Sequence, residues 1–201
     1  MAMTVSSLRQ GLARIAAQME GTADELNALD GQLGDGDLGV TMVRGGRAVA
    51  ELLPGLPDDL GQAFLACAQA FTRLSGSSYG TLVATALMSA AKATKGRAEM
   101  PWAEVSTLLA GARDAMMARG KANLGQKTVL DPLDAAAKVT AGLDDPAAIL
   151  AAARRAVAET MDAFRGQPAQ IGRARIFGDR SIGLDDPGML AFRRVLDGLA
   201  G

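Results

Sequence analysis

One segment decides how this chain is organised: Leu29-Asp30-Gly31-Gln32-Leu33-Gly34-Asp35-Gly36-Asp37-Leu38-Gly39. It carries three aspartates within eight residues, interleaved with glycines, and no lysine or arginine occurs between Met19 and Val43. Repulsion between these carboxylates favours a bound cation, and Mg²⁺ prefers carboxylate oxygens while leaving room for substrate phosphates. The segment therefore predicts a Mg²⁺-phosphate site between two helices. The alternative is an acidic turn in which Asp37 caps the following helix.

The composition of the chain favours helices over strands. Of its 201 residues, 49% are apolar but only 3% are aromatic, and alanine-rich runs such as residues 147–158 recur. Alanine loses least on entering a helix, whereas strands draw on aromatic and β-branched residues. The length suits a single domain, residues 1–201, that buries a core of its own.

Helical periodicity and breaking residues predict about eight helices. Pro101 and Pro187 are expected in the first turns of the fifth and eighth helices, where proline fits best. Short connections then favour an all-α fold, an eight-helix antiparallel up-down barrel or bundle. In such a fold the connections after the odd-numbered helices meet at one end, which predicts one composite site. The predicted helices span residues 4–29, 37–53, 58–74, 81–94, 101–120, 128–141, 146–164 and 187 onward.

Charge and residue usage exclude several classes of function. A formal net charge of −1 gives no global field that attracts nucleic acid, and the few aromatic residues do not provide a base-stacking surface. Cys67 is the single cysteine, which excludes an internal disulfide and fits a reducing compartment. The chain contains no histidine, so it cannot form a phosphohistidine or use a histidine base.

The sequence predicts neither a secretory signal nor a membrane span. Arg9 and Arg14 interrupt the N-terminal region, where a signal would need a continuous apolar core. The longest uncharged stretch, residues 74–91, has serines and glycines in its first half, which indicates a loop followed by a helix start. We therefore expect a cytoplasmic protein that binds neither membrane nor nucleic acid.

A serine-rich loop precedes the predicted fourth helix. Gly76-Ser77-Ser78-Tyr79-Gly80-Thr81 offers hydroxyls and backbone N–H groups where unpaired amides and the helix dipole favour an anion. The alternative is a helix cap followed by a turn, which needs only one of the hydroxyls.

A third glycine-bearing loop precedes the predicted sixth helix. Gly120-Lys121-Ala122-Asn123-Leu124-Gly125-Gln126-Lys127-Thr128 nearly matches a P-loop, but Gln126 is inserted and residues 110–119 are predicted helical where a P-loop follows a strand. The pattern excludes a Walker site and leaves open a loop that closes over a nucleotide.

Arginines gather in the irregular stretch 166–186. Gly172-Arg173-Ala174-Arg175 and Asp179-Arg180-Ser181 supply three guanidinium groups, whose planar fork suits phosphate. A solvated basic loop is the alternative. An acidic loop and an arginine loop at the same end together favour a nucleotide-phosphate site.

These loops give the chain a family resemblance. It resembles the L subunit of dihydroxyacetone kinase, and equally the nucleotide-binding domain of single-chain dihydroxyacetone kinases (the DhaL or DAK2 domain family). The resemblance covers almost the whole chain. The matching elements are Leu29-Asp30, Gly34-Asp35-Gly36-Asp37 with Gly39, Arg119-Gly120-Lys121-Ala122, Lys127-Thr128 with Asp131, Gly172-Arg173-Ala174, Gly178-Asp179-Arg180-Ser181-Ile182-Gly183 and Asp186-Pro187-Gly188.

The resemblance implies an eight-helix barrel that holds ADP or ATP with Mg²⁺ at one end. It implies that Asp30, Asp35 and Asp37 bind the metal, with two ions bridging to the phosphates, and that Arg173 completes the catalytic set. The implied nucleotide contacts are Leu38, Gly39, Val40, Thr41, Ser77, Ser78, Gly120, Val129, Arg173, Asp186, Pro187 and Gly188.

The resemblance also implies a partner. In the family, a separate K subunit or domain holds dihydroxyacetone through a histidine, so this chain would act as a half-enzyme of glycerol metabolism. The phosphoryl donor is either a phosphohistidine carrier protein that recharges bound ADP, or ATP. Leu38 stands where many members have His or Cys, so that residue does not distinguish the two. A different ketose, such as a tetrulose, and a non-catalytic adaptor to a transcription regulator remain alternatives.

Overall fold

The structure of the protein, a computed structural model, describes residues 2–74 and 76–200. Within these ranges eight α-helices account for most of the chain, which confirms the all-α prediction. Three short 3₁₀-helices lie between them: η1 (Leu53–Gly55), η2 (Trp102–Glu104) and η3 (Ala174–Ser181). The α-helices are α1 (Val5–Leu33), α2 (Leu38–Leu52), α3 (Leu60–Leu74), α4 (Ser78–Ala93), α5 (Val105–Gly120), α6 (Leu130–Val139), α7 (Pro146–Arg165) and α8 (Pro187–Ala200).

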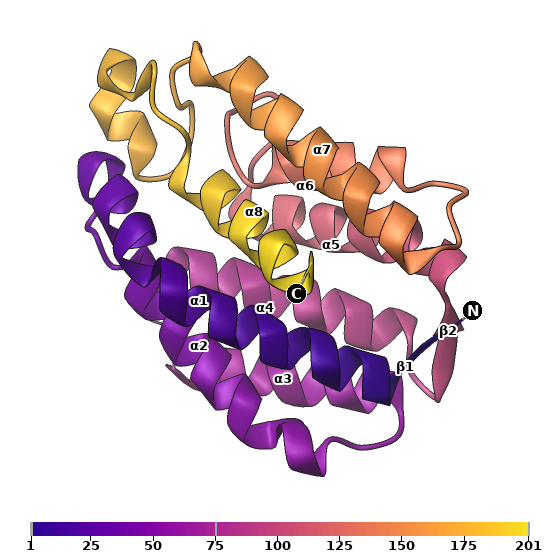
Figure 1. Ribbon diagram of the computed structural model, residues 1–201. Helices are drawn as coiled ribbons and strands as arrows, with labels where there is room; N and C mark the ends of the chain where they lie inside the picture. Colours follow the sequence, from indigo (N-terminus) through magenta and orange to yellow (C-terminus); the bar gives the residue numbers. More distant parts are fainter. Residues whose placement is uncertain (1, 75, 201) are drawn as a thin grey trace.

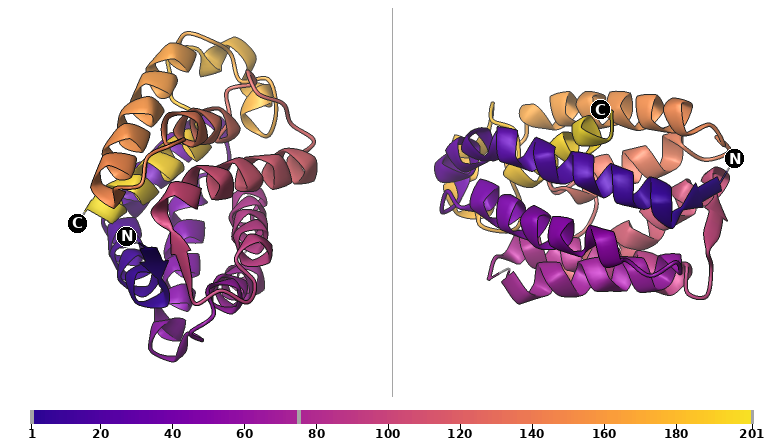
Figure 2. Two further views of the ribbon diagram at one scale, coloured as in Figure 1. Left: turned by 90° about the vertical axis from the view of Figure 1, so that its right-hand side faces the viewer. Right: turned by 60° about the horizontal axis from the view of Figure 1, so that its bottom comes forward.

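The helices form a closed antiparallel ring. Each helix packs against the next one along the chain, and α8 packs against α1. Figure 1 shows the loop between α1 and α2 and the segment before α8 at the same end of the molecule, away from the N-terminus. Figure 2 shows the same arrangement from two further directions. The predicted convergence of the odd-numbered connections is therefore observed.

The start of the fifth helix differs from the prediction. Pro101 does not lie in a helical turn but ends strand β2 (Glu99–Pro101), which pairs antiparallel with β1 (Ala2–Thr4). The pairing places Met3 opposite Met100 and buries both side chains, so apolar burial outweighs the local preference of proline for a helix start. The chain then forms η2 before α5 begins at Val105.

Two other helix boundaries were wrong by one turn. The first helix continues to Leu33, whose side chain packs against Ala169 and Ala174 of the arginine-bearing segment. Asp30 therefore lies in the last turn of α1 rather than in a loop. The fourth helix begins at Ser78, three residues earlier than predicted, because the Ser77 hydroxyl accepts a hydrogen bond from the Gly80 amide and caps it.

The interior of the ring is filled mainly by leucine, methionine and alanine. Cys67 belongs to this core, and burial raises the pKa of its thiol to about 11, so it remains protonated at neutral pH. Within residues 2–74 and 76–200, no helix combines the length and apolar character needed to cross a bilayer.

Close packing of α3 against the end of α4 requires glycine at position 61. A Cβ there would lie 2.6 Å from the Cα of Lys95 and 2.8 Å from the carbonyl oxygen of Ala91, both backbone atoms.

Gly61→Ala should therefore lower the free energy of unfolding by about 1–3 kcal/mol in urea titrations. Gly21→Ala is the control, because a Cβ at that α1 position meets nothing within 4 Å and should stabilise the helix by about 0.5–1 kcal/mol. Equal effects of the two substitutions would contradict the packing argument.

Candidate functional site

Three carboxylates converge where α1 meets α2. Asp30 comes from the last turn of α1, and Asp35 and Asp37 come from the connection to α2. One oxygen of each lies within 4.8 Å of the others, with Asp30 half-buried and the other two exposed. Three hard oxygen donors at this spacing suit a divalent cation with water and phosphate as further ligands.

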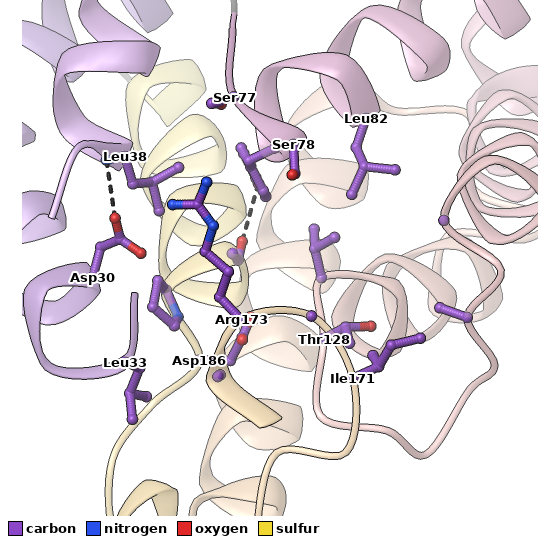
Figure 3. Close-up of a pocket in the computed structure, with 18 of the residues that line it drawn as sticks. Asp30, Leu33, Leu38, Ser77, Ser78, Leu82, Thr128, Ile171, Arg173 and Asp186 are labelled. Carbon is purple, nitrogen blue, oxygen red and sulfur yellow. Dashed lines mark hydrogen bonds between the residues drawn. The ribbon is translucent and has the colours of Figure 1, made fainter. Parts of the chain in front are cut away.

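Asp30 also caps α2. Its Oδ2 accepts hydrogen bonds from the Asp37 amide at 3.0 Å and the Leu38 amide at 3.3 Å, and Figure 3 shows the contact toward Leu38. Asp37 makes no side-chain cap of its own. In the acidic-turn alternative Asp37 could cap this helix, but Asp30 takes that role, so capping does not account for the Asp37 carboxylate.

The next two amides of α2 are engaged by Asn27. Its Oδ1 accepts from the Gly39 amide at 2.8 Å and the Val40 amide at 3.2 Å, while the Thr41 amide donates to the Asp37 carbonyl. Of the four α2 residues predicted to contact nucleotide, Leu38 lines the neighbouring cavity. The roles of Gly39, Val40 and Thr41 stay predictions, with their amides already occupied.

A cavity of about 730 Å³ opens beside the carboxylates, a volume in the usual range for small-molecule sites. All four connections at this end contribute to its wall. The predicted site residues that line it are Asp30, Asp35, Asp37, Leu38, Ser77, Ser78, Gly120, Val129, Arg173, Asp186, Pro187 and Gly188.

Arg173 reaches across the cavity toward the acidic connection. Its guanidinium forms an ion pair with Asp35, and Figure 3 shows the side chain extending between Asp30 and Ser78. Arg175 and Arg180 do not line the cavity: both are exposed, and Arg180 lies over the Phe177 ring. Of the three arginines, Arg173 therefore lines the cavity, whereas Arg175 and Arg180 are exposed to solvent outside it.

The side of the cavity formed by α4, α5 and α6 contributes apolar side chains. Leu82, Met116, Ala122 and Leu130 line it together with Val129. Such a surface suits a flat ring, whereas the acidic side suits a hard cation. Of these, only Val129 was predicted as a site residue. Leu82, Met116 and Leu130 have the spacing of ordinary helix-core positions, and Ala122 was quoted in a loop pattern without a role of its own.

Polar groups at the starts of α4 and α8 are held by hydrogen bonds. The Tyr79 hydroxyl donates to the Gly188 carbonyl at 3.0 Å, and burial raises its pKa, so it is a neutral donor. Asp186 Oδ1 accepts from the Met189 amide at 2.9 Å and caps α8. Burial raises the pKa of Asp186 to about 6, although the Met189 amide favours its charged form.

Lys127 holds the arginine-bearing segment (residues 166–186) in place through hydrogen bonds to backbone carbonyls. It is 1% exposed, and its ammonium donates to the carbonyls of Arg165 at 3.4 Å, Gln167 at 2.7 Å and Ser181 at 2.8 Å. Burial lowers its pKa. Arg165 also forms an ion pair with Asp185 at 2.9 Å, and this pair joins the two ends of the segment. The position of Arg173 thus depends on a lysine that the sequence analysis quoted in two patterns without predicting this role.

Lys127→Met should lower the free energy of unfolding by about 1–3 kcal/mol, because buried carbonyls lose their donor. Amide hydrogen exchange should also become faster in residues 166–181. The control is Lys92→Met, an exposed position on α4 where we expect a change below about 0.5 kcal/mol. Unchanged stability and exchange in Lys127→Met would contradict the anchoring role.

The fold and this site define a class: a helical barrel with a carboxylate cluster and a facing arginine at one end. Comparison with known families identifies it, since the DAK2 domain family matches residues 32–201. The chain belongs to the DAK2 domain family.

Several known proteins share this domain. The ADP-binding subunit DhaL of PEP-dependent dihydroxyacetone kinase from Escherichia coli is 33% identical over 186 residues, covering 89% of this chain and 87% of that protein. Triokinase/FMN cyclase of Homo sapiens is 31% identical over 192 residues, covering 92% of this chain and 33% of the relative. L-erythrulose 1-kinase of Mycolicibacterium smegmatis is 35% identical over 187 residues, covering 87% of this chain and 32% of that protein.

The fold agrees with a solved structure. The native dihydroxyacetone kinase of C. freundii superposes with a TM-score of 0.77 and 26% identity, covering 96% of this chain and 34% of that one. Its complex with AMP-PNP and Mg²⁺ superposes with a TM-score of 0.75. The chain therefore spans about a third of the length of that kinase, and nearly all of the Escherichia coli subunit.

Proposed function

We propose that this chain is the nucleotide-binding subunit of a dihydroxyacetone-type kinase, which passes a phosphoryl group from bound nucleotide to a ketose on a partner subunit. One observation carries the proposal: three carboxylates within reach of one cation face an arginine across a cavity of nucleotide size. The similarity to an ADP-binding kinase subunit of nearly equal length supports it.

The charge of the cavity supports a bound metal ion. Its described lining carries four carboxylates, from Asp30, Asp35, Asp37 and Asp186, against two guanidinium groups, from Arg119 and Arg173. A nucleotide phosphate entering this surface would be repelled unless a divalent cation lay between them. Asp30, Asp35 and Asp37 would hold Mg²⁺, as one ion or two.

Bound Mg²⁺ would neutralise phosphate charge and align the transferring group, which is most of what phosphoryl transfer requires. The chain itself binds and orients. Arg173 would exchange Asp35 for a phosphate group, to two of whose oxygens its fork can donate. Ser77, Ser78, Gly120 and the Asp186-Pro187-Gly188 turn would contact the nucleotide, whose ring would lie against Val129 and the apolar wall.

A second subunit is part of the proposal. The sequence contains no histidine, so this chain cannot hold a ketose through one, and a K subunit would supply it. The proposed donor is a phosphohistidine carrier protein that recharges bound ADP, in line with the name of the PEP-dependent Escherichia coli relative. The similarity to L-erythrulose 1-kinase favours a second candidate, an ATP-dependent kinase subunit for a tetrulose.

Asp35→Asn tests the metal assignment. It should weaken Mg²⁺-dependent ADP binding in calorimetry at least about tenfold, because a charge-assisted contact contributes about 1.5–3 kcal/mol. Unfolding should change little, since the Arg173 pair that is lost lies on exposed side chains. Asp24→Asn, an exposed carboxylate of α1, is the charge-matched control. Mg-ADP binding by Asp35→Asn at the parent's affinity would contradict the assignment.

The nucleotide that accompanies the purified protein distinguishes the two donors. The protein is prepared with Mg²⁺, dialysed extensively and denatured, and the released nucleotide is quantified. We expect near-stoichiometric ADP, as for a coenzyme recharged in place. An empty protein that binds Mg-ATP reversibly would favour the ATP-dependent candidate, and a protein that binds neither would overturn the proposed function.

A further inference from the structure

Asn27 stands at the junction between the carboxylate cluster and the helix that follows it. It lies on α1 three residues before Asp30 and four after Ala23, so these three positions share the face of α1 that meets the start of α2. The side chain is half-buried. No compositional bias or motif marks this residue in the sequence.

The first four amides of this helix start are shared between two side chains of α1. Such amides have no partner within their own helix and must be satisfied from outside. Asp30 takes those of Asp37 and Leu38, and Asn27 takes those of Gly39 and Val40. The cap of α2 is therefore built from the preceding helix, and the carboxylates of Asp35 and Asp37 are not used in it.

Close approach of the two helices makes this possible. A Cβ at Gly39 would lie 2.0 Å from the Ala23 carbonyl oxygen and 2.8 Å from Asn27 Oδ1. Only glycine allows the α2 amide to come within hydrogen-bonding distance of Asn27. Gly39 thereby serves the contact between helices, a role independent of any contact to nucleotide.

We propose that Asn27 is the positioning residue of the metal site. By holding the Gly39 and Val40 amides it fixes the start of α2, and with it Asp37, at a set distance from Asp30 on its own helix. Asp30 then needs only Oδ2 for its two capping bonds, so that Oδ1 would be left for the cation. An amide oxygen does this without adding a fourth negative charge to the cluster. The inference rests on the proposed function, because it assumes that the cluster binds a divalent cation.

The experiment compares Asn27→Ala with Asn27→Asp and a matched capping control. Asp145→Ala removes the cap of α7, where Asp145 Oδ2 accepts from the Ala148 amide at 2.8 Å, far along the chain from the carboxylates. Each protein is titrated with Mn²⁺ in the presence of ADP, and the concentration of free Mn²⁺ is measured by electron paramagnetic resonance. Urea unfolding and amide exchange at positions 37–40 of the metal-free proteins are measured alongside.

We expect Asn27→Ala to weaken Mn²⁺ binding about tenfold or more, the effect typical of losing a group that orients metal ligands. Exchange at Gly39 and Val40 should become faster. Asp145→Ala should lose comparable stability while keeping the parent's Mn²⁺ affinity. Asn27→Asp keeps an oxygen acceptor and should bind Mn²⁺ at least as tightly as the parent.

The contrary outcomes are distinguishable. Parent-like Mn²⁺ affinity in Asn27→Ala, or no recovery in Asn27→Asp, would overturn the positioning role and leave the proposed function standing. A parent protein that binds no Mn²⁺ with ADP would overturn both.

Discussion

The structure of the site depends on the capping of α2 by side chains of α1. Helix starts ordinarily draw their caps from the residue just before them. Here Asn27 and Asp30 supply the cap from one helix away, across a contact that only a glycine at position 39 permits. Because capping does not use the carboxylates of Asp35 and Asp37, these two groups of the connection can gather with that of Asp30 in one cluster. The acidic surface of the cavity follows from this constraint.

The connections between the helices contribute chemically different side chains to the cavity. The acidic connection supplies the carboxylates that we propose as cation ligands, the segment before α8 supplies Arg173, and the α4–α6 side supplies apolar side chains. Each part suits a different portion of an Mg-nucleotide, and none would suffice alone. Lys127 joins the arginine-bearing segment to the start of α6, so the arrangement rests on a buried charge that is satisfied by backbone carbonyls.

Much of this could be predicted from the sequence, and the exceptions have physical reasons. Helical periodicity and the alternation of loops predicted the ring of helices and the convergence of the odd-numbered connections at one end, because both follow from local patterns. The strand at Pro101 was missed because it depends on pairing with residues near the N-terminus, remote in sequence. Asn27 and Lys127 were missed as holders of the site because their partners lie twelve or more residues away. Only the folded chain identifies those partners.

The most direct test of the account is a crystal structure of the protein grown with Mn²⁺ and AMP-PNP. The anomalous signal of Mn²⁺ locates the ion independently of the chain. We predict a peak between the carboxylates of Asp30, Asp35 and Asp37, with phosphate oxygens completing its coordination and Arg173 moved from Asp35 to the phosphates. Nucleotide bound elsewhere, or no peak while Arg173 remains paired with Asp35, would contradict the claim that this cluster is a metal-nucleotide site.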